Sequence, residues 1–244
     1  MRKYLADLHV HTCLSPCADT QMSPRKIVRA ARRQGLDIIA VCDHNSCENA
    51  TAVIRAAGSE GLRVLPGMEV TSREEVHVVA LFEKLEDALA LQVMIYQHLH
   101  GENDQDAFGM QVVVNELSEV LGFNERLLIG ATDLSIDQVV EAIHRYGGLA
   151  VAAHIDRMGF GIIAQLGFIP DGLGLDALEV SSKMPLERAR GEFKAYSNAA
   201  FISSSDAHSL DQIGRGRTQF IIRDAHLSEI SKAFRGAEGR AVLV

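Results

Sequence analysis

The segment YLADLHVHT, residues 4–12, joins a short apolar run to two histidines at its carboxyl end. Such a run is typical of a β-strand, and histidines two positions apart on a strand point to the same face. Ser23 and Pro24 follow in the pattern of a helix N-cap and first helical residue, and Gly35 is placed to end that helix. The start of the chain is therefore predicted to form a strand, a polar strand end and a helix.

The order of strand and helix repeats along the chain. Further strands are predicted at residues 36–42, 62–70, 76–82, 149–154, 176–181, 201–205 and 219–223. Helices are predicted at residues 24–34, 47–60, 135–146 and 185–197 and from residue 227. This alternation is typical of an α/β fold with a largely parallel sheet. Residues 85–130 break the rhythm with a helix and a hairpin, so we expect one barrel-like domain over residues 1–244 with an insertion at about 85–130.

Composition excludes several classes of protein. With 47% hydrophobic and 23% charged residues, the 244-residue chain can bury a large core, which excludes general disorder. The formal charge, 24 − 32 = −8, argues against a broad basic surface for nucleic acid but is compatible with a local basic groove. No apolar run approaches the ~18 residues of a membrane span. The N-terminus has basic residues followed by Asp7 instead of an apolar segment, which is not a secretory signal, so a cytoplasmic protein is expected.

Polar side chains capable of binding metal recur where the predicted strands end. They are His9, His11, Asp43, His44, Glu69, His77, His154, Asp206 and His208. In a barrel of parallel strands these ends converge on one face, where barrel active sites lie. Each signal alone is weak, since a lone His-x-His pair arises by chance and His77 is also compatible with a core histidine. Six imidazoles and several carboxylates together exceed what one ion can use, so two or three divalent ions are predicted, with Glu69 bridging them.

The order and spacing of these motifs resemble those of the PHP (polymerase and histidinol phosphatase) superfamily over about residues 4–222. The motifs are DLHVHT (7–12), CDHN (42–45), GME (67–69), AH (153–154) and SDAH (205–208). The resemblance implies a distorted (β/α)7 TIM-like barrel and a trinuclear metal centre that hydrolyses phosphate esters. It implies three ligand sets: His9, His11, Glu69 and Asp206; then Glu69, His77 and His154; then His44, His208 and one ligand from the loop after the first motif.

That loop departs from the commoner family pattern, in which Ser-Asp-Gly follows the first motif. Here residues 13–19 read CLSPCAD, and either Asp19 or Cys17 is available as the missing ligand. Asp19 is preferred because a carboxylate keeps the family's ligand type and suits a hard ion such as Mn²⁺. Cys17 would instead favour Zn²⁺ or Fe²⁺. The four cysteines form no Cys-x-x-Cys pair, so reduced thiols are expected.

The expected reaction is in-line attack on phosphorus by a metal-bridging hydroxide. Asp206 or His208 is the candidate for carrying a proton to the leaving oxygen. Arg157 and Lys183 follow predicted strand ends, where a cation can orient the phosphate. Asp7 and Asp43 are expected behind the ligands, orienting their imidazole rings.

The resemblance favours a nucleotide-type substrate, either a 3′,5′-bisphosphonucleotide or the 5′-phosphorylated end of an oligonucleotide. The alternative is a phosphatase for histidinol phosphate or another small molecule. A non-catalytic metal-binding module is less favoured, because the ligand set of the sequence is complete. Neither the native metal nor the oligomeric state follows from these residues.

Overall fold

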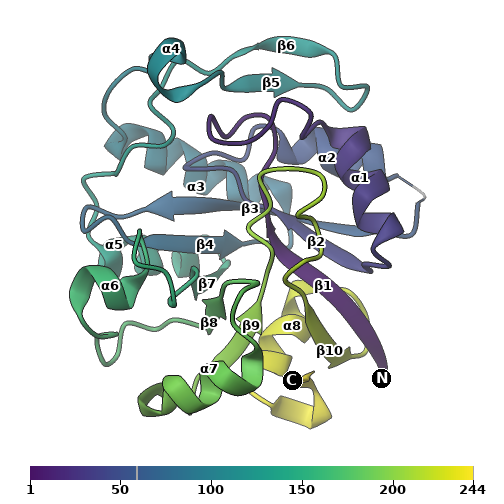
Figure 1. Ribbon diagram of the computed structural model, residues 1–244, viewed down its shortest axis with the longest axis vertical. Helices are drawn as coiled ribbons and strands as arrows, with labels where there is room; N and C mark the ends of the chain where they lie inside the picture. Colours follow the sequence, from purple (N-terminus) through teal and green to yellow (C-terminus); the bar gives the residue numbers. More distant parts are fainter. Residues whose placement is uncertain (59, 244) are drawn as a thin grey trace.

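One curved sheet organises the computed structural model, which describes residues 1–58 and 60–243 (Figure 1). In spatial order its strands are β11 (Ala241–Leu243), β10 (Thr218–Ile222), β1 (Arg2–Val10), β2 (Ile38–Val41), β3 (Arg63–Thr71), β4 (His77–Leu81), β7 (Leu149–Ala152), β8 (Ala177–Val180) and β9 (Ala200–Ser203). Hydrogen bonds between Ser203 and Thr218, and from the backbone of His11 to that of Ala207, bring the last strands back toward the first. The predicted barrel-like α/β fold is confirmed.

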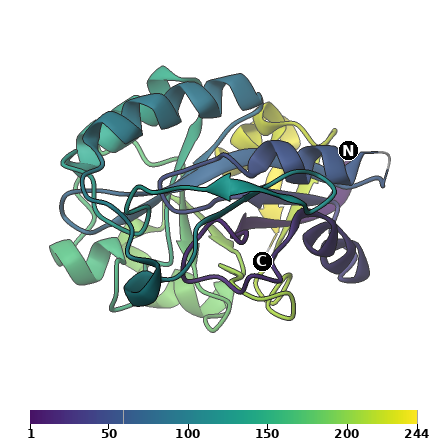
Figure 2. The same ribbon diagram turned by 90° about the horizontal axis from the view of Figure 1, so that it is seen from above.

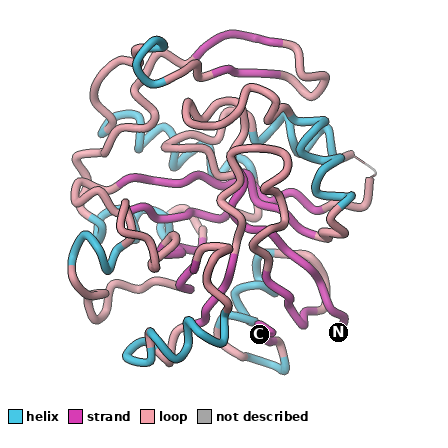
Figure 3. Tube along the Cα trace, viewed as in Figure 1, coloured by secondary structure: helices cyan, strands magenta, loops and turns pink. Residues whose placement is uncertain are grey.

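Helices surround this sheet, as the secondary-structure colouring of Figure 3 shows. They are α1 (Pro24–Arg33), α2 (Ala50–Ala57), α3 (Leu85–His98), α4 (Gln105–Phe108), α5 (Ile136–Arg145), α6 (Ile162–Leu166), α7 (Leu186–Glu192) and α8 (Leu227–Phe234), with 3₁₀ turns at Lys194–Tyr196 and Ala237–Gly239. Residue 59, within the helix predicted over 47–60, and residue 244 lie outside the described residues. None of the helices described here combines the length and apolar character needed to cross a membrane.

The sheet is less parallel than the sequence pattern predicts. Strand β4 runs antiparallel to both of its neighbours, β3 and β7, while β1–β2–β3 and β7–β8–β9 are parallel. The reason is the short connection over residues 72–76, since a parallel crossover needs a dozen residues or more. The reversal matters for function, because His77 at the start of β4 pairs with Thr71 at the end of β3. His77 therefore lies at the same edge as the carboxyl ends of the parallel strands.

Side-chain alternation divides the apolar residues into two layers. Leu65 of β3, Val79 and Leu81 of β4 and Val151 of β7 belong to the cluster inside the curve of the sheet. The intervening residues of these strands pack outward in the cluster that includes α1, α2, α3 and α5, while α8 packs against the inner cluster. Glu69 is four residues after Leu65 on β3, so its side chain points to the same inner face of the sheet, beyond the apolar cluster.

The insertion covers the loop that follows the first strand. The expected hairpin forms as β5 (Val112–Val114) and β6 (Val120–Phe123), a separate two-stranded sheet that lies across the top of the molecule (Figure 2). The backbone of Val112 donates to the carbonyl of Cys13, and the Asn49 side chain donates to the carbonyl of Val112. The hairpin thus packs on residues 13–17, where the sequence departs from the family pattern.

Candidate metal centre

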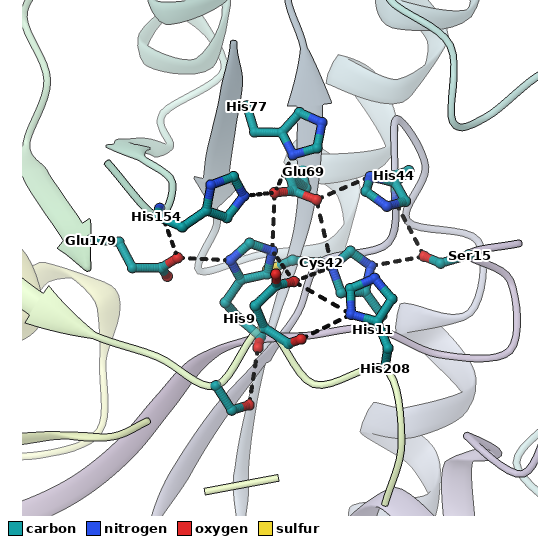
Figure 4. Close-up of polar contacts among 12 residues, drawn as sticks. His9, His11, Ser15, Cys42, His44, Glu69, His77, His154, Glu179 and His208 are labelled. Atoms are coloured by element: carbon teal, nitrogen blue, oxygen red, sulfur yellow. Dashed lines mark hydrogen bonds and ion pairs between the residues drawn. The ribbon is translucent and has the colours of Figure 1, made fainter. Parts of the chain in front are cut away.

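Five imidazoles lie within 3.5 Å of the Glu69 carboxylate, and a sixth, that of His208, packs against His11 (Figure 4). One set of ligand atoms belongs to His9, His11, Glu69 and Asp206, all within 4.8 Å of one another. His11 Nε2 lies 2.9 Å from Asp206 Oδ1, and His9 Nε2 lies 3.4 Å from both Asp206 Oδ1 and Glu69 Oε1. The four side chains are at most 7% exposed, so any ion among them would be shielded from solvent. This set has the same members as the first ligand group that the resemblance implies.

The Glu69 carboxylate also meets three further histidines. Its Oε1 lies 2.8 Å from His77 Nδ1 and 3.1 Å from His154 Nε2. Its Oε2 lies 3.0 Å from His44 Nδ1, and His44, Glu69 and His77 form a second compact set of ligand atoms. The carboxylate is therefore placed between two groups of imidazoles, as a bridging ligand would be.

A third set combines His11, His44 and His208. The Nδ1–H of His208 donates to the carbonyl of Asp206 over 2.8 Å, because a carbonyl oxygen can only accept. This bond leaves Nε2 of His208 unprotonated in the neutral ring and able to bind a cation. Its side chain is 26% exposed, so this set lies nearest to solvent.

The two loop candidates differ in position. Cys17 Sγ lies 3.2 Å from His44 Nε2, and Cys17 is exposed while the other three cysteines are buried. The carboxylate of Asp19 is exposed and accepts a hydrogen bond from the backbone of Gln21 at 2.8 Å. The structure therefore brings Cys17, and not the preferred Asp19, beside the third set. Although the residue is exposed, partial desolvation of its sulfur at the cavity wall opposes ionisation, but hydrogen bonds from His208 and His44 lower the pKa of the Cys17 thiol to about 7.

Glu179 is a buried carboxylate that the sequence analysis missed. Its Oε1 lies 3.0 Å from His9 Nδ1 and accepts a hydrogen bond from the backbone of His154. With Nδ1 held by Glu179, the Nε2 of His9 faces Glu69 and Asp206. The signal in the sequence is the run Ala177-Leu178-Glu179-Val180, in which one charge interrupts a buried apolar strand.

Asp43 reaches the metal ligands through a neighbouring hydroxyl. The Ser15 hydroxyl donates to Asp43 Oδ1 over 2.7 Å, so its oxygen accepts from Nδ1–H of His11 at 2.9 Å. This relay leaves Nε2 of His11 free for a cation. Asp7 differs from the expectation, because its carboxylate accepts hydrogen bonds from the backbones of Ser205 and Gly214 and, among the described residues, forms no hydrogen bond or ion pair with an imidazole.

The charges of this cluster perturb one another strongly. Burial alone would raise the pKa of Glu69, but the neighbouring His77, His9 and His44 hold it well below its usual value. Burial alone would lower the pKa of His9, but Glu179, Glu69 and Asp206 hold it well above its usual value. The backbone is also unusual here, because Asp206 and His154 have positive φ angles of 50° and 29°. Perturbed carboxylates and strained backbone are typical of functional sites.

A cavity of about 230 Å³ opens onto the cluster. Its walls are Cys17, His44, Glu69, His77, Ile129, His154, Arg157, Gly159, Phe160, Asp206 and His208. Arg157 Nη1 donates a hydrogen bond to Asp206 Oδ2, so this cation, predicted to bind substrate, lies in the cavity wall beside the cluster. Lys183 is exposed and does not line the cavity, which differs from the expectation for that residue. A strand end sets only the edge of the sheet on which a residue lies, and the turn after Ser181 carries Lys183 away from the centre.

Several buried polar atoms of this cluster make no well-directed hydrogen bond within the described residues, even where an ion-pair partner lies 2.8 or 3.0 Å away. They are His9 Nε2, His44 Nδ1, Glu69 Oε2, His77 Nδ1 and His154 Nδ1. A buried polar atom left without a partner is costly, and nearly all such atoms in folded proteins are satisfied. Imidazole nitrogens and carboxylate oxygens are suitable ligands for Zn²⁺, Fe²⁺ and Mn²⁺. The residues present therefore fit a site for divalent cations.

Comparisons with known proteins agree with this geometry. A family model described as PHP domain matches residues 7–159, and one described as PHP-associated matches residues 187–238. Across its whole length the chain is 23% identical to the uncharacterized protein YqxK of Bacillus subtilis, of which it covers 65%. Over 63% of its length it is 24% identical to a 5′-3′ exoribonuclease of Haemophilus influenzae, of which it covers 69%.

The fold has a counterpart of known structure. The lesion-specific endonuclease PfuEndoQ from Pyrococcus furiosus matches 100% of this chain with a TM-score of 0.75 and 18% identity. The match covers 58% of that endonuclease, so the chain spans less than two thirds of the length of PfuEndoQ and of YqxK. At this identity the similarity establishes a shared fold.

Proposed function

The chain belongs to the PHP domain family, and on that premise we propose that it is a metal-dependent phosphoesterase, a hydrolase acting on phosphate esters. The proposal rests on one observation: buried imidazoles and carboxylates face one another around Glu69 at the base of a cavity that contains Arg157. Divalent ions such as Mn²⁺, Zn²⁺ or Fe²⁺ would supply Lewis acidity and polarise water at neutral pH. We assign three cation positions, held by His9, His11, Glu69 and Asp206; by Glu69, His77 and His154; and by His44, His208 and one residue of the loop 13–19.

The side chains at the cavity have separate tasks in this proposal. The Arg157 guanidinium, 41% exposed, binds a phosphoryl oxygen and orients the ester. Asp206 turns Oδ1 toward His9 and His11 and Oδ2 toward Arg157. Asp206 Oδ2, which is paired with Arg157, is one candidate for carrying a proton toward the leaving group, and His208 is the second. Phe160, stacked on His77 with ring centroids 4.4 Å apart, forms an apolar wall that limits water.

Two observations favour a nucleotide-type substrate that extends beyond the cavity. The cavity volume of about 230 Å³ is below the roughly 300–1,000 Å³ of typical ligand pockets, so a nucleotide-sized ester would extend beyond it. The exposed side of α1 carries Arg25, Lys26, Arg29, Arg32 and Arg33, and these residues form no ion pair within the described chain. A groove beside α1 also includes Leu210 and Asp211, which lie two and three residues after His208 in the chain. Nucleic-acid enzymes among the similar proteins, an exoribonuclease and a lesion-specific endonuclease, support the same class.

The test is hydrolysis by chelator-treated protein reloaded with Mn²⁺, Zn²⁺ or Fe²⁺. The substrates are p-nitrophenyl phosphate, adenosine 3′,5′-bisphosphate, histidinol phosphate and a 5′-phosphorylated oligonucleotide. We expect metal-dependent turnover with the highest kcat/KM for the bisphosphonucleotide or the oligonucleotide. Faster turnover of histidinol phosphate would instead support a small-molecule phosphatase.

Asp206→Asn provides the matching site variant. It should lower kcat by more than about 100-fold, because even residues behind metal ligands change activity by 10- to 100-fold. Asp133→Asn is the control, since this exposed carboxylate pairs with His98 and His100 and does not line the cavity. An unchanged rate in Asp206→Asn would contradict the site, and absence of any turnover with metals bound would contradict the enzyme and favour a non-catalytic module.

A further inference from the structure

The loop over residues 13–19 is fixed to the metal centre by its backbone and by Ser15. Asp19 N–H donates to the carbonyl of His208 over 2.8 Å, and Ala18 N–H donates to the carbonyl of Ser15 over 2.9 Å. The Ser15 hydroxyl joins this loop to His11 and Asp43. Gly109 of the insertion packs so closely that a Cβ there would lie 2.4 Å from the carbonyl oxygen of Pro16. Cys17 is therefore an exposed thiol on a tightly held loop.

The thiol faces a group of imidazoles that already has the form of a cation site. Cys17 Sγ lies 3.2 Å from His44 Nε2, and the ligand atoms of His11, His44 and His208 lie within 4.8 Å of one another. The His44 side chain is 6% exposed, and its Nδ1 lies 3.0 Å from Glu69 Oε2, so Nε2 is the ring nitrogen that faces the Cys17 thiol. Asp19, two residues later, uses its carboxylate to cap the backbone of Gln21.

We propose that Cys17, as a thiolate, is a ligand of the third cation together with His44 and His208. This inference rests on the proposed function, and it names the residue of the loop that the third position needs. A sulfur and two imidazoles favour Zn²⁺, Fe²⁺ or Co²⁺ over Mn²⁺ or Mg²⁺. The set of His9, His11, Glu69 and Asp206 has two carboxylates and accepts harder ions. The centre therefore has positions that prefer different ions. The position with the Cys17 sulfur prefers softer ions and lies nearest to solvent.

Titration of the metal-free protein with Co²⁺ tests the assignment without any enzyme assay. Co²⁺ bound to a thiolate gives a charge-transfer band in the near ultraviolet, and we expect this band in the wild type. Cys17→Ser should lose the band and about one equivalent of tightly bound Zn²⁺, whereas Asp19→Asn should keep both. Cys17→Asp should bind the third cation without the band and shift the preferred ion toward Mn²⁺.

The outcomes separate this inference from the proposed function. A band that persists in Cys17→Ser, or a cation lost in Asp19→Asn, would overturn the assignment of Cys17 even if the enzyme is active. A Cys17-dependent band in a protein that hydrolyses no phosphate ester would support the ligand and contradict the enzyme. Circular dichroism of each metal-free variant verifies that the loop substitution leaves the fold intact.

Discussion

Glu179 contacts the centre through the His9 ring and through the backbone N–H of His154, and it belongs to none of the three ligand sets, so its role is separable from that of the ligands. Its carboxylate lies 3.0 Å from His9 Nδ1 and is 1% exposed. Glu179→Gln keeps the side-chain shape but removes the charge that orients the ring and increases its basicity. We expect metal affinity to fall by about 10- to 100-fold, as measured by competition with a chelator.

The control for Glu179 is Glu141→Gln, which changes an exposed carboxylate that pairs only with Arg145 on the same helix. It should leave metal affinity unchanged. Wild-type affinity in Glu179→Gln, with thermal melting of the metal-free protein also unchanged, would show that His9 is oriented without this carboxylate.

Individual ligand residues could be predicted because histidine is rare at the end of an apolar strand. His9, His11, His44, His77 and His154 come together as their positions indicated. The choice between Asp19 and Cys17 could not be made in the same way, since a loop has no fixed periodicity and its direction depends on backbone contacts such as Asp19 N–H to His208 O. Lys183 shows the same limit, because nothing in its sequence neighbourhood fixes the direction of the turn.

At the scale of elements, strand β3 holds Glu69 in place through close packing at Gly67. A Cβ at Gly67 would lie 2.5 Å from the carbonyl oxygen of Ala80 and 3.0 Å from Cys42 Sγ. Gly67→Ala must therefore push β3 away from β4 or β2, and overpacking of this kind costs about 1–3 kcal/mol. We expect a lower free energy of unfolding in urea and weaker metal binding, because Glu69 lies two residues further along.

Gly122→Ala is the matched control for Gly67→Ala. Gly122 also lies within a strand, β6, but a Cβ there would meet nothing within 4 Å. The free energy of unfolding of Gly122→Ala should equal that of the wild type or be slightly higher, because alanine reduces the conformational entropy of the unfolded chain. Equal stability of the two variants would contradict the packing argument.

The elements themselves were largely predictable, while their direction was not. Apolar runs and capping residues such as Ser135, which forms a capping box with Gln138, identified most strands and helices. The reversal of β4 was missed because a strand has the same side-chain period in either direction. Strand β11 was missed because three half-buried residues at the end of the chain give too short a pattern.

At the scale of the whole molecule, positive charge is concentrated on α1 although the chain carries a net charge of −8. Arg29 and Arg33 line both of the grooves beside this helix, and the groove that includes Leu210 adjoins the loop after His208. A nucleic-acid strand whose phosphorylated end enters the cavity would have its sugar-phosphate backbone close to these arginines. Such contacts raise affinity without changing the chemical step and are screened by salt.

The double variant Arg29→Glu and Arg33→Glu therefore discriminates between a long and a short substrate. We expect KM for a 5′-phosphorylated oligonucleotide to rise about tenfold, and the slope of log affinity against log salt to fall by about 1 per lost contact. The kcat/KM for p-nitrophenyl phosphate should stay within about twofold, because that ester does not reach α1. Arg223→Glu with Arg235→Glu makes the same charge change at two exposed positions beside α8 and should leave both substrates unaffected. The α1 and α8 variants could instead behave alike, or the α1 variant could lower kcat/KM equally for both substrates. Either result would show that α1 does not bind the oligonucleotide and that the substrate is confined to the cavity.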